Sequence, residues 1–477
     1  MGWIIPVVFL AALIAFYRLA YPLLNDNDVP WHLAIGQLLM TTHHLPATDV
    51  WAYGNHDHPW YILSWVWDLL LGMVQQLSGE FGTFIFTLAI GAGLTAGITY
   101  RLLKLDITLP AVLMTSILAG LCLLDYITAR PQLIGYVLAF MFHAILHASR
   151  KDAGYKHLRW LPLLMLLWAN AHGSFMVGFI ILGTYGVEAW FTQKREWLKR
   201  IIIIGAACAI CGLINPYGPK VVLGALLSFT SPATRYTAEW LPFSFGTSTG
   251  LSIWLVMVIL SSNLRGAHVS IADKILAMGW FIATMFSIRN GAFFILLSAP
   301  YFATCIDEQT RDLRKPQPVS PVVTFMNRQP LGRVWLGCIA VFALFYAIAY
   351  AAPHADKIES EDFSVKDAID FALAHYPDHH FYSDYNFGGQ IIYRTQGTLP
   401  FFMDSRASTA YDYHAVNEFM EFLKLSDGWE KNLRKRDLNG IITEKSTNFA
   451  NAYEKGLYHD RWKLVFTGKR ANVYITR

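Results

Sequence analysis

Charged residues are scarce in this chain. Only 15% of its 477 residues are Asp, Glu, Lys or Arg, whereas soluble domains contain about 25%. Hydrophobic residues make up 54% of the sequence, and long apolar runs recur from residue 3 to residue 352. This composition excludes an ordinary soluble enzyme. It predicts a mostly α-helical membrane protein whose chain crosses the bilayer many times.

Cysteine is also rare. The five cysteines all lie inside apolar segments, at Cys122, Cys208, Cys211, Cys305 and Cys338. Cys208 and Cys211 form a C-x-x-C pair, but at helical spacing within a predicted span, which favours small packing residues over a redox or zinc pair. Residues 353–477 contain no cysteine. An exported C-terminal region would therefore need no disulfides.

Several signals of targeting and partners are missing as well. The net charge is only +4 and no run of Lys or Arg is long enough to suggest a nucleic-acid partner. The N-terminus has neither a basic region nor a small-x-small cleavage site, and the apolar run Trp3–Leu24 is long enough to cross a bilayer. We therefore expect a retained membrane helix rather than a cleaved signal peptide.

Together with Trp3–Leu24, the remaining apolar segments predict about 11 to 13 membrane spans. They lie at 60–78, 82–103, 108–126, 131–148, 158–171, 175–192, 199–214, 219–230, 251–263, 273–288, 291–305 and 334–352. Basic residues concentrate in four loops, at 149–159, 194–200, 265–274 and 311–333. The positive-inside rule places these loops in the cytoplasm. The first polar loop then lies outside if 60–78 and the short 219–230 do not cross. The alternative is that 60–78 crosses and the parity is restored elsewhere.

The composition changes at Pro353. Residues 1–352 are predicted to form a transmembrane domain with an outer loop at 25–59, and residues 353–477 a small soluble α/β domain on the non-cytoplasmic side. We expect helices at 364–375 and 414–425, and strands at Phe381–Asp384, Gln390–Tyr393 and Ala471–Ile475.

The most unusual stretch is the polar break Asn25–Leu33, which follows the first apolar run. It delivers Asp26 and Asp28 to a membrane surface, where carboxylates are costly to desolvate and usually face water or have a function. A carboxylate there suits a general base for an attacking hydroxyl, or a ligand to a divalent cation such as Mg²⁺ or Mn²⁺, for which Asp28 is the candidate. His32 follows as a candidate acid/base or phosphate partner.

Six further polar residues are predicted on the same side of the membrane as this loop. They are Arg130, Asn170, His172, Asn215, Glu239 and Arg289. Polar residues end helices, so each has an ordinary structural interpretation. An arginine at an outer membrane surface also suits a lipid phosphate, because its fork pairs bidentately with phosphate oxygens. Together with the carboxylates, these residues indicate group transfer from a phosphate-linked lipid.

The pattern as a whole resembles the C-type (GT-C) glycosyltransferase superfamily, and most closely an uncharacterised bacterial multi-pass branch. The matching motifs are Asp26-x-Asp28-x-x-Trp31-His32-Leu33-Ala34-x-Gly36, Pro46-x-x-Asp49, Pro59-Trp60, Leu167-Trp168-Ala169-Asn170-x-His172-Gly173, Asn215-Pro216-Tyr217-Gly218 and Glu239-Trp240. The resemblance implies a polyprenyl-phosphate sugar donor, an acidic residue of the first outer loop as catalytic base, and inversion at the anomeric carbon.

On this basis we expect a glycosyltransferase in the bacterial inner membrane, with a glycan, lipid or protein acceptor at the periplasmic face. Asp26 and Asp28 would be the base and the metal or acceptor ligand, in an order that stays open. Arg130 and Arg289 would hold phosphate. The alternatives are a transporter or flippase of a lipid-linked saccharide, which inverted repeats would favour although none is visible, and a non-catalytic assembly protein with the same fold.

The C-terminal region carries a fainter resemblance. Ser383–Gln390, followed by Asp404-Ser405-Arg406, is similar to the W-W-D-Y-G acceptor segment of oligosaccharyltransferases, but both tryptophans are absent. Recognition of a peptide acceptor is therefore not carried over. The sequence predicts a tight turn at Gly388-Gly389 and a local ion pair of little energetic value between Asp404 and Arg406.

Overall fold

A computed structural model gives the structure of the chain and describes residues 26–151, 155–230, 238–245, 249–262, 269–312, 365–406 and 410–477. The predicted first span Trp3–Leu24, the apolar segment 334–352 with Cys338, and most of the basic loop 311–333 lie outside the described residues. The described residues fall into two compact units, one within 83–218 and 238–312 and the other within 26–82, 219–230 and 365–477.

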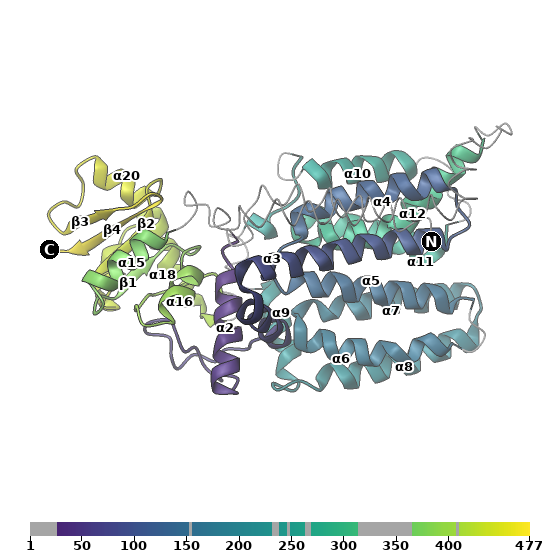
Figure 1. Cartoon of the computed structure of the whole chain (residues 1–477), viewed down its shortest axis with the longest axis horizontal. Coiled ribbons are helices and arrows are strands. Elements are labelled where there is room, and N and C mark those ends of the chain that lie inside the picture. The colour runs from purple at the N-terminus through teal and green to yellow at the C-terminus, as the bar shows by residue number, and fades with distance from the viewer. Residues whose placement is uncertain are drawn as a thin grey trace. The chain divides into compact units, whose positions relative to one another are not determined.

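The first unit is a helical bundle. It contains the later part of α3 (Trp65–Leu103), α4 (Leu109–Leu123), α5 (Gln132–Ser149), α6 (Leu161–Ala171), α7 (Met176–Phe191), α8 (Arg195–Leu213), α10 (Thr249–Ser262), α11 (Ile271–Phe286) and α12 (Gly291–Asp312). Helix α6 packs along α8, α5 packs against α6 and α7, and α12 packs against α4 and α11 (Figure 1). Each of these helices lies within or overlaps an apolar segment that the sequence predicted.

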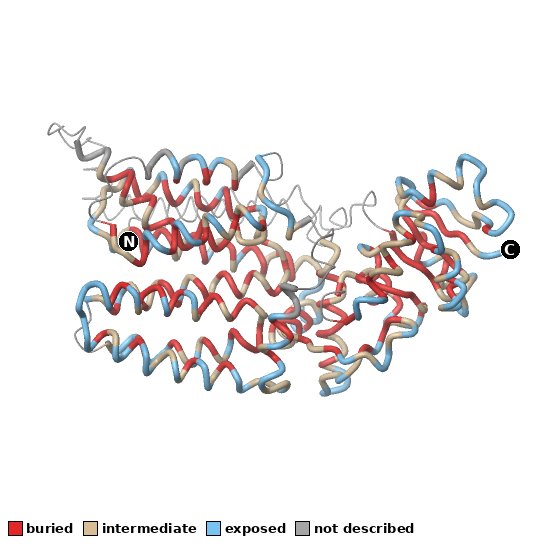
Figure 2. The backbone as a smooth tube through the Cα atoms, turned by 180° about the vertical axis from the view of Figure 1, so that it is seen from behind, coloured by how far each residue is buried: buried red, intermediate tan, exposed pale blue. Residues whose placement is uncertain are grey.

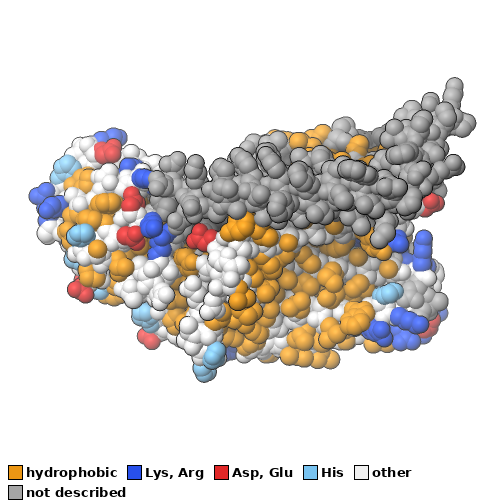
Figure 3. Space-filling view, in the orientation of Figure 1, with side chains coloured by type: hydrophobic (Ala, Val, Ile, Leu, Met, Phe, Trp, Pro, Cys, Tyr) orange, Lys and Arg blue, Asp and Glu red, His pale blue; other side chains and the backbone are white. Residues whose placement is uncertain are grey.

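The outer surface of this bundle is apolar. Buried positions recur along every helix of the bundle (Figure 2), and hydrophobic side chains cover the outer face of α5 to α8 (Figure 3). Exposed members on these four helices include Met141, Leu163, Ile180, Trp190, Ile202 and Ile210. Water disfavours an apolar surface of this extent. The chain is therefore a polytopic helical membrane protein, as the composition predicted.

Four helical segments of the described residues are long and apolar enough to cross a bilayer. They are Trp65–Leu103, Leu109–Tyr126, Gln132–Ser149 and Gly173–Phe191. Helix α9 (Lys220–Thr230) is about 16 Å long, too short for the roughly 30 Å hydrocarbon core. This agrees with the prediction that 219–230 does not cross.

Helix α3 is broken near its middle by Gly79. This residue has φ 66° and ψ −165°, a conformation that glycine adopts readily and other residues avoid. The stretch from Glu80 to Leu103 is about 36 Å long and can cross a bilayer by itself. The segment before Gly79 is thus not needed for the crossing, which is compatible with the predicted non-crossing segment 60–78.

The two ends of the bundle differ in their polar residues. Helices α6, α8 and α11 each begin after a basic loop and end at a polar break, near residues 170, 215 and 287 respectively. Helix α5 runs the other way, because it begins just after Arg130 and ends beside Arg150. In Figure 3, Lys and Arg gather at the end of the bundle where α5 ends and α8 begins. The six polar residues that the sequence singled out in this unit therefore share the opposite end.

A buried ionic network closes the basic end. Arg150 on α5 pairs with Glu188 on α7 at 2.7 Å and with Asp273 on α11 at 3.4 Å. His143 contacts Asp273 at 3.1 Å, and the guanidinium of Arg101 lies 2.7 Å from His143. Two cations and two anions from four helices neutralise one another, as buried charges must. We therefore interpret these residues as a structural connection between the four helices.

The second unit combines early and late parts of the chain. It contains α2 (Val29–Thr42), the first part of α3, α9 and the C-terminal elements. The C-terminal elements are α15 (Lys366–His375), β1 (Phe381–Ser383), α16 (Gly388–Thr395), α18 (Tyr413–Lys424), α19 (Trp429–Lys435), β2 (Gly440–Glu444), α20 (Asn448–Glu454), β3 (Trp462–Thr467) and β4 (Ala471–Thr476). The four strands form one mixed sheet in the order β1-β2-β4-β3, with only β1 and β2 parallel.

Several sequence predictions for this region are confirmed and one is wrong. The predicted helices at 364–375 and 414–425 correspond to α15 and α18, and two of the predicted strands correspond to β1 and β4. Gln390–Tyr393 was expected to be a strand but lies within α16, where Ile391 and Ile392 are both buried. A short apolar pair fits either structure, and here helix packing decides. Helix α2 also lies within the predicted outer loop 25–59.

Asp384, at the carboxyl end of β1, makes the stability of this unit depend on pH. Its carboxylate accepts hydrogen bonds from Thr443 Oγ1 (3.0 Å) and the Glu444 backbone N–H (2.6 Å). Burial nevertheless raises its pKa to about 7. Between pH 4 and pH 7 the folded chain keeps a proton that the unfolded chain releases, so the free energy of unfolding should fall by about 4 kcal/mol as the pH rises.

We predict that Asp384→Asn removes this dependence, because an amide oxygen can still accept both hydrogen bonds but cannot ionise. The measurement is the apparent thermal unfolding midpoint of the full chain in detergent at pH 4.5 and pH 7.5. The change in midpoint between the two pH values should be smaller in the variant. An equal change in both proteins would mean that Asp384 is already ionised at pH 4.5 in the folded chain.

Candidate functional site

The acidic pair lies at the start of α2. Asp28 is the residue before the first helical turn, and Pro30 helps to start the helix because its missing N–H would be unpaired there. The Asp28 backbone N–H donates to Asp26 Oδ1 at 3.0 Å, and Trp31 Nε1 donates to Asp28 Oδ1 at 3.2 Å. Both aspartates are half-buried. The two carboxylates are thus held in a defined arrangement that is still partly open to solvent.

A buried pair anchors α2 just behind these aspartates. His32 Nδ1 lies 2.6 Å from Asp68 Oδ1, and Ser64 Oγ donates to Asp68 Oδ2 at 2.9 Å. Asp68 is fully buried and His32 almost so. The sequence pointed to His32 but missed Asp68, although a lone carboxylate in the apolar segment 60–78 is itself an indication of function. Asp68 of α3 therefore fixes the position of His32, and the Nδ1 atom of the ring is already hydrogen-bonded to it.

The C-terminal region contacts the acidic loop through Gly389. A Cβ atom at this position would lie 2.5 Å from the Asn27 carbonyl oxygen and 3.2 Å from Trp31 Cδ1, so no larger residue fits without a shift. The sequence predicted a tight turn at Gly388-Gly389. That prediction is wrong, because these glycines begin α16. They permit close approach to neighbouring backbone instead.

A buried ionic cluster connects the outer loop to the same region. Arg406 Nη1 lies 3.0 Å from Asp49 Oδ1, and its Nη2 lies 2.6 Å from Asp404 Oδ2, with all three side chains 0% exposed. Trp51 and Trp60 lie 5.1 Å and 4.5 Å from the guanidinium carbon. The predicted Asp404–Arg406 ion pair is confirmed. The prediction that it is only local and of little value is wrong, because Asp49, 357 residues before Arg406, joins it and the cluster is buried.

The charges of this buried cluster are balanced within it. Burial alone would lower the pKa of Arg406, but the carboxylates of Asp404 and Asp49 outweigh that effect and raise its pKa above the usual range. The guanidinium stays charged, and each carboxylate has a hydrogen-bonded partner. We interpret the cluster as a structural connection within the second unit and not as a binding site.

The bundle contributes a separate polar group. Glu239, in the 3-10 helix Ala238–Trp240, pairs with Arg130, and Arg289 Nη1 lies 3.6 Å from its other oxygen. Arg289 also lies over the Trp240 ring, 4.8 Å from its centroid, and its side chain is 30% exposed. Two guanidinium groups beside one carboxylate form a partly open, basic cluster. Such a cluster can bind a phosphate oxygen.

Two predicted site residues have structural roles in the bundle. Asn170 Nδ2 donates to the carbonyls of Leu166 (2.8 Å) and Ile214 (2.9 Å). Asn215 Nδ2 donates to the Ala169 carbonyl at 2.9 Å and to Asn170 Oδ1 at 3.1 Å. The last carbonyls of a helix have no partner within the helix. The amides therefore connect the ends of α6 and α8.

His172 has a local role too. Its Nδ1 accepts the Ser174 backbone N–H at 3.2 Å, so the proton of the neutral ring is on Nε2. Ser174 Oγ lies 2.6 Å from the same nitrogen and accepts from Trp168 Nε1 at 3.0 Å. The ring thus caps the 3-10 helix Gly173–Phe175. This contact gives His172 a structural role, and its role in a binding pocket stays a prediction.

The structure brings the predicted residues together in three groups. Asp26, Asp28 and His32 meet at the start of α2 in the second unit, whereas the basic cluster and the Asn170–Asn215 pair belong to the bundle. Among the described residues, no three His, Cys, Asp or Glu side chains come together as a metal site. Two neighbouring carboxylates are still compatible with Mg²⁺, which usually keeps several water ligands and needs one or two carboxylates.

Comparison with known proteins gives matches by structure only. No protein-family model and no curated protein sequence matches the chain. Two solved structures of the Archaeoglobus fulgidus oligosaccharyltransferase are similar over 92% of this chain and 69% of theirs. They are the apo form, at 12% identity and a TM-score of 0.59, and AglB in complex with an inhibitory peptide and a dolichol-phosphate, at 13% identity and a TM-score of 0.58.

The apo structure of ArnT from Cupriavidus metallidurans is similar over almost the full length of both chains. The match covers 99% of this chain and 97% of ArnT, with a TM-score of 0.55 and 12% identity. Identities this low establish a common fold and no more. The chain thus has the GT-C fold that the sequence resemblance predicted.

Proposed function

We propose that this protein is a membrane glycosyltransferase that moves a sugar from a polyprenyl-phosphate donor to an acceptor at the non-cytoplasmic face of the bacterial inner membrane. The observation that carries the proposal is the fixed pair of half-buried carboxylates at the start of α2, in a chain with the GT-C fold. The proposed donor class is supported by the similar AglB structure, which is in complex with a dolichol-phosphate.

The proposed reaction is a single displacement. An acceptor hydroxyl oxygen attacks the anomeric carbon, its proton passes to a carboxylate of the Asp26–Asp28 pair, and the bond from that carbon to the phosphate oxygen breaks. Polyprenyl phosphate leaves with the bonding electrons, and the configuration at the anomeric carbon inverts. The second carboxylate orients the acceptor or holds a metal. Arg130 and Arg289 stabilise the leaving phosphate.

A divalent metal ion fits the same pair of carboxylates. Mg²⁺ or Mn²⁺ would be held by Asp28 together with Asp26, and when bound it would neutralise negative charge on the phosphate. The side chains keep their own roles in this scheme. His32, anchored by Asp68, holds the first turn of α2 in place, and Trp31 fixes the orientation of the Asp28 carboxylate.

Arg289→Gln is expected to weaken donor binding. The variant keeps a polar side chain but loses the charge and the fork that bind phosphate, so KM for the donor should rise by about 10-fold or more, because a charge-assisted hydrogen bond is worth about 1.5–3 kcal/mol. The measurement is initial transfer rate against donor concentration. Arg159→Gln, an exposed arginine at the opposite end of the bundle, serves as the control. An unchanged KM would remove Arg289 from the site.

The proposal as a whole is tested by transfer with the purified full chain. The protein in detergent is supplied with a polyprenyl-phosphate carrying a radiolabelled sugar and with an extract of envelope lipids and glycans. We expect the label to move to an acceptor while polyprenyl phosphate is released. Label that stays on the donor, across several donor sugars, would contradict the proposal.

A further inference from the structure

The strongest feature outside the proposed site is a pocket between α2 and α3. The two helices cross in backbone contact at Gly36 and Gly72, where a Cβ atom on Gly36 would lie 2.9 Å from the Gly72 Cα. Beyond this crossing, the second half of α2 and the first part of α3 line a pocket of about 920 Å³. This volume falls within the range of small-molecule binding sites.

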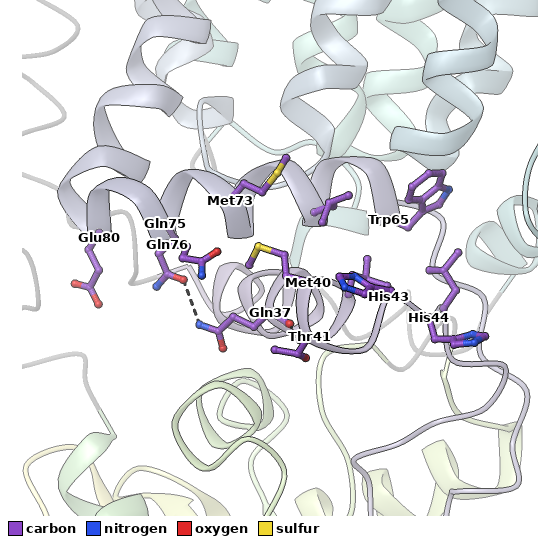
Figure 4. A pocket seen from close by; sticks show the side chains of 14 residues that line it. Gln37, Met40, Thr41, His43, His44, Trp65, Met73, Gln75, Gln76 and Glu80 are labelled. Atoms are coloured by element: carbon purple, nitrogen blue, oxygen red, sulfur yellow. Dashed lines mark hydrogen bonds between the residues drawn. The ribbon is translucent and has the colours of Figure 1, made fainter.

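The lining of the pocket is amphipathic. Met40 of α2 and Met73 of α3 lie in its middle, with polar side chains at both ends (Figure 4). One end has the polar residues Gln37, Gln75, Gln76 and Glu80, and the other has His43, His44 and the aromatic ring of Trp65. Methionine side chains adapt to irregular apolar ligands. The pocket therefore suits a molecule with an apolar chain and a hydrogen-bonding head.

The charges of the lining restrict which head can bind. Among the described residues that form the pocket, none is Lys or Arg, so a phosphate head would have no guanidinium or ammonium group beside it. Gln37 Nε2 donates to Gln75 Oε1 at 3.4 Å, and Gln75 also hydrogen-bonds the Tyr393 hydroxyl. The Gln76 amide makes no hydrogen bond with the described residues. Neutral amides suit the hydroxyl groups of an uncharged sugar.

The pocket is separate from the acidic pair. Met40 lies twelve residues after Asp28 on one helix, which corresponds to about 18 Å along its axis. Gln37, where the head would bind, lies nine residues after Asp28, or about 13–14 Å along the axis, which is still too far for direct contact with the carboxylates. The pocket is consequently a second site, whose ligand need not take part in the reaction.

We propose that this pocket binds a lipid with an uncharged sugar head. The acyl chain contacts Met40, Leu69 and Met73, and the sugar hydroxyls bond to Gln37 and Gln76. Because the described lining has no Lys or Arg, it favours this uncharged head over an anionic phospholipid. The inference goes beyond the proposed transfer and does not depend on it.

Photolabelling tests the proposal. The full chain is reconstituted in phosphatidylglycerol nanodiscs with a monoglucosyl diacylglycerol that carries a diazirine in one acyl chain, and the labelled residues are found by mass spectrometry. We expect label on Met40, Leu69 and Met73, displaced by unlabelled glucosyl lipid and not by added phosphatidylglycerol. Gln76→Ala should weaken this displacement about 3- to 10-fold, the value of one hydrogen bond.

Controls separate the outcomes. Leu77→Ala changes an 87% exposed neighbour that does not line the pocket and should bind as the wild type does. A variant with Asp26→Asn and Asp28→Asn should also bind normally, so binding and transfer can fail independently. Label spread evenly over the lipid-facing helices, or displaced equally by phosphatidylglycerol, would show ordinary contact with bilayer lipid and overturn the proposal.

Discussion

Asn in place of whichever of Asp26 and Asp28 is the general base is expected to abolish most of the sugar transfer. Removal of the general base should lower kcat by about 10²- to 10⁴-fold. An amide oxygen can still accept the hydrogen bonds from Trp31 and from the Asp28 backbone, so the start of α2 should keep its geometry. The fall in kcat would then result from the missing base and not from a rearranged loop.

The two single variants also assign the roles that the sequence left open. The variant with the larger fall in kcat identifies the base, and the other should mainly raise KM for the acceptor or the metal requirement. Asp57→Asn provides a matched control, because Asp57 lies in the same outer region but is exposed, and its rate should equal that of the wild type. If both Asp26→Asn and Asp28→Asn retain the wild-type rate in folded protein, neither residue is the base.

Arg406→Met is expected to cause the largest loss of stability. The substitution leaves Asp49 and Asp404 buried without their cation, and breaking a buried ion pair in this way costs about 3–5 kcal/mol. The outer loop should separate from the C-terminal region. The measurement is the apparent thermal midpoint of the full chain, together with the rate of proteolysis within residues 43–60.

The control for this prediction is Arg434→Met. Arg434 has a 76% exposed side chain and a single long contact of 3.8 Å to Glu430, and surface changes of this kind are usually within about 0.5 kcal/mol of neutral. Arg406→Met with Asp49→Asn should recover part of the stability, since one buried charge is then removed. A thermal midpoint for Arg406→Met equal to that of Arg434→Met would contradict the account of the cluster.

The bundle was predictable because its signal is local. Apolar runs such as 131–148 and 175–192 are long, and a helix is the only single segment that satisfies its backbone in lipid. The polar breaks at Arg130, Glu239 and Arg289 were also found at one end of the bundle, because alternation of basic loops is enough to assign them. Their pairing could not be predicted, since it depends on how three segments that are distant in the sequence pack together.

The second unit was predicted less well because its contacts are remote in the chain. Asp49 and Arg406 are 357 residues apart, and the sequence around each residue gives no indication that the other is its partner. Gly389 looked like a turn residue, although its role is to let α16 approach Asn27. Asn170 and His172 were assigned to a pocket, yet the polar groups at the ends of helices already explain their contacts.

Transfer in sealed proteoliposomes tests the central claim most directly. The full chain is reconstituted with a polyprenyl-phosphate sugar labelled in the sugar, an acceptor is supplied, and the chemical form of the label is followed over time beside the Asp26→Asn/Asp28→Asn variant. The account predicts that label appears on the acceptor with inverted configuration, that polyprenyl phosphate is released, and that the variant does neither. Label that crosses the bilayer still attached to its lipid, equally in both proteins, would contradict it and identify a transporter.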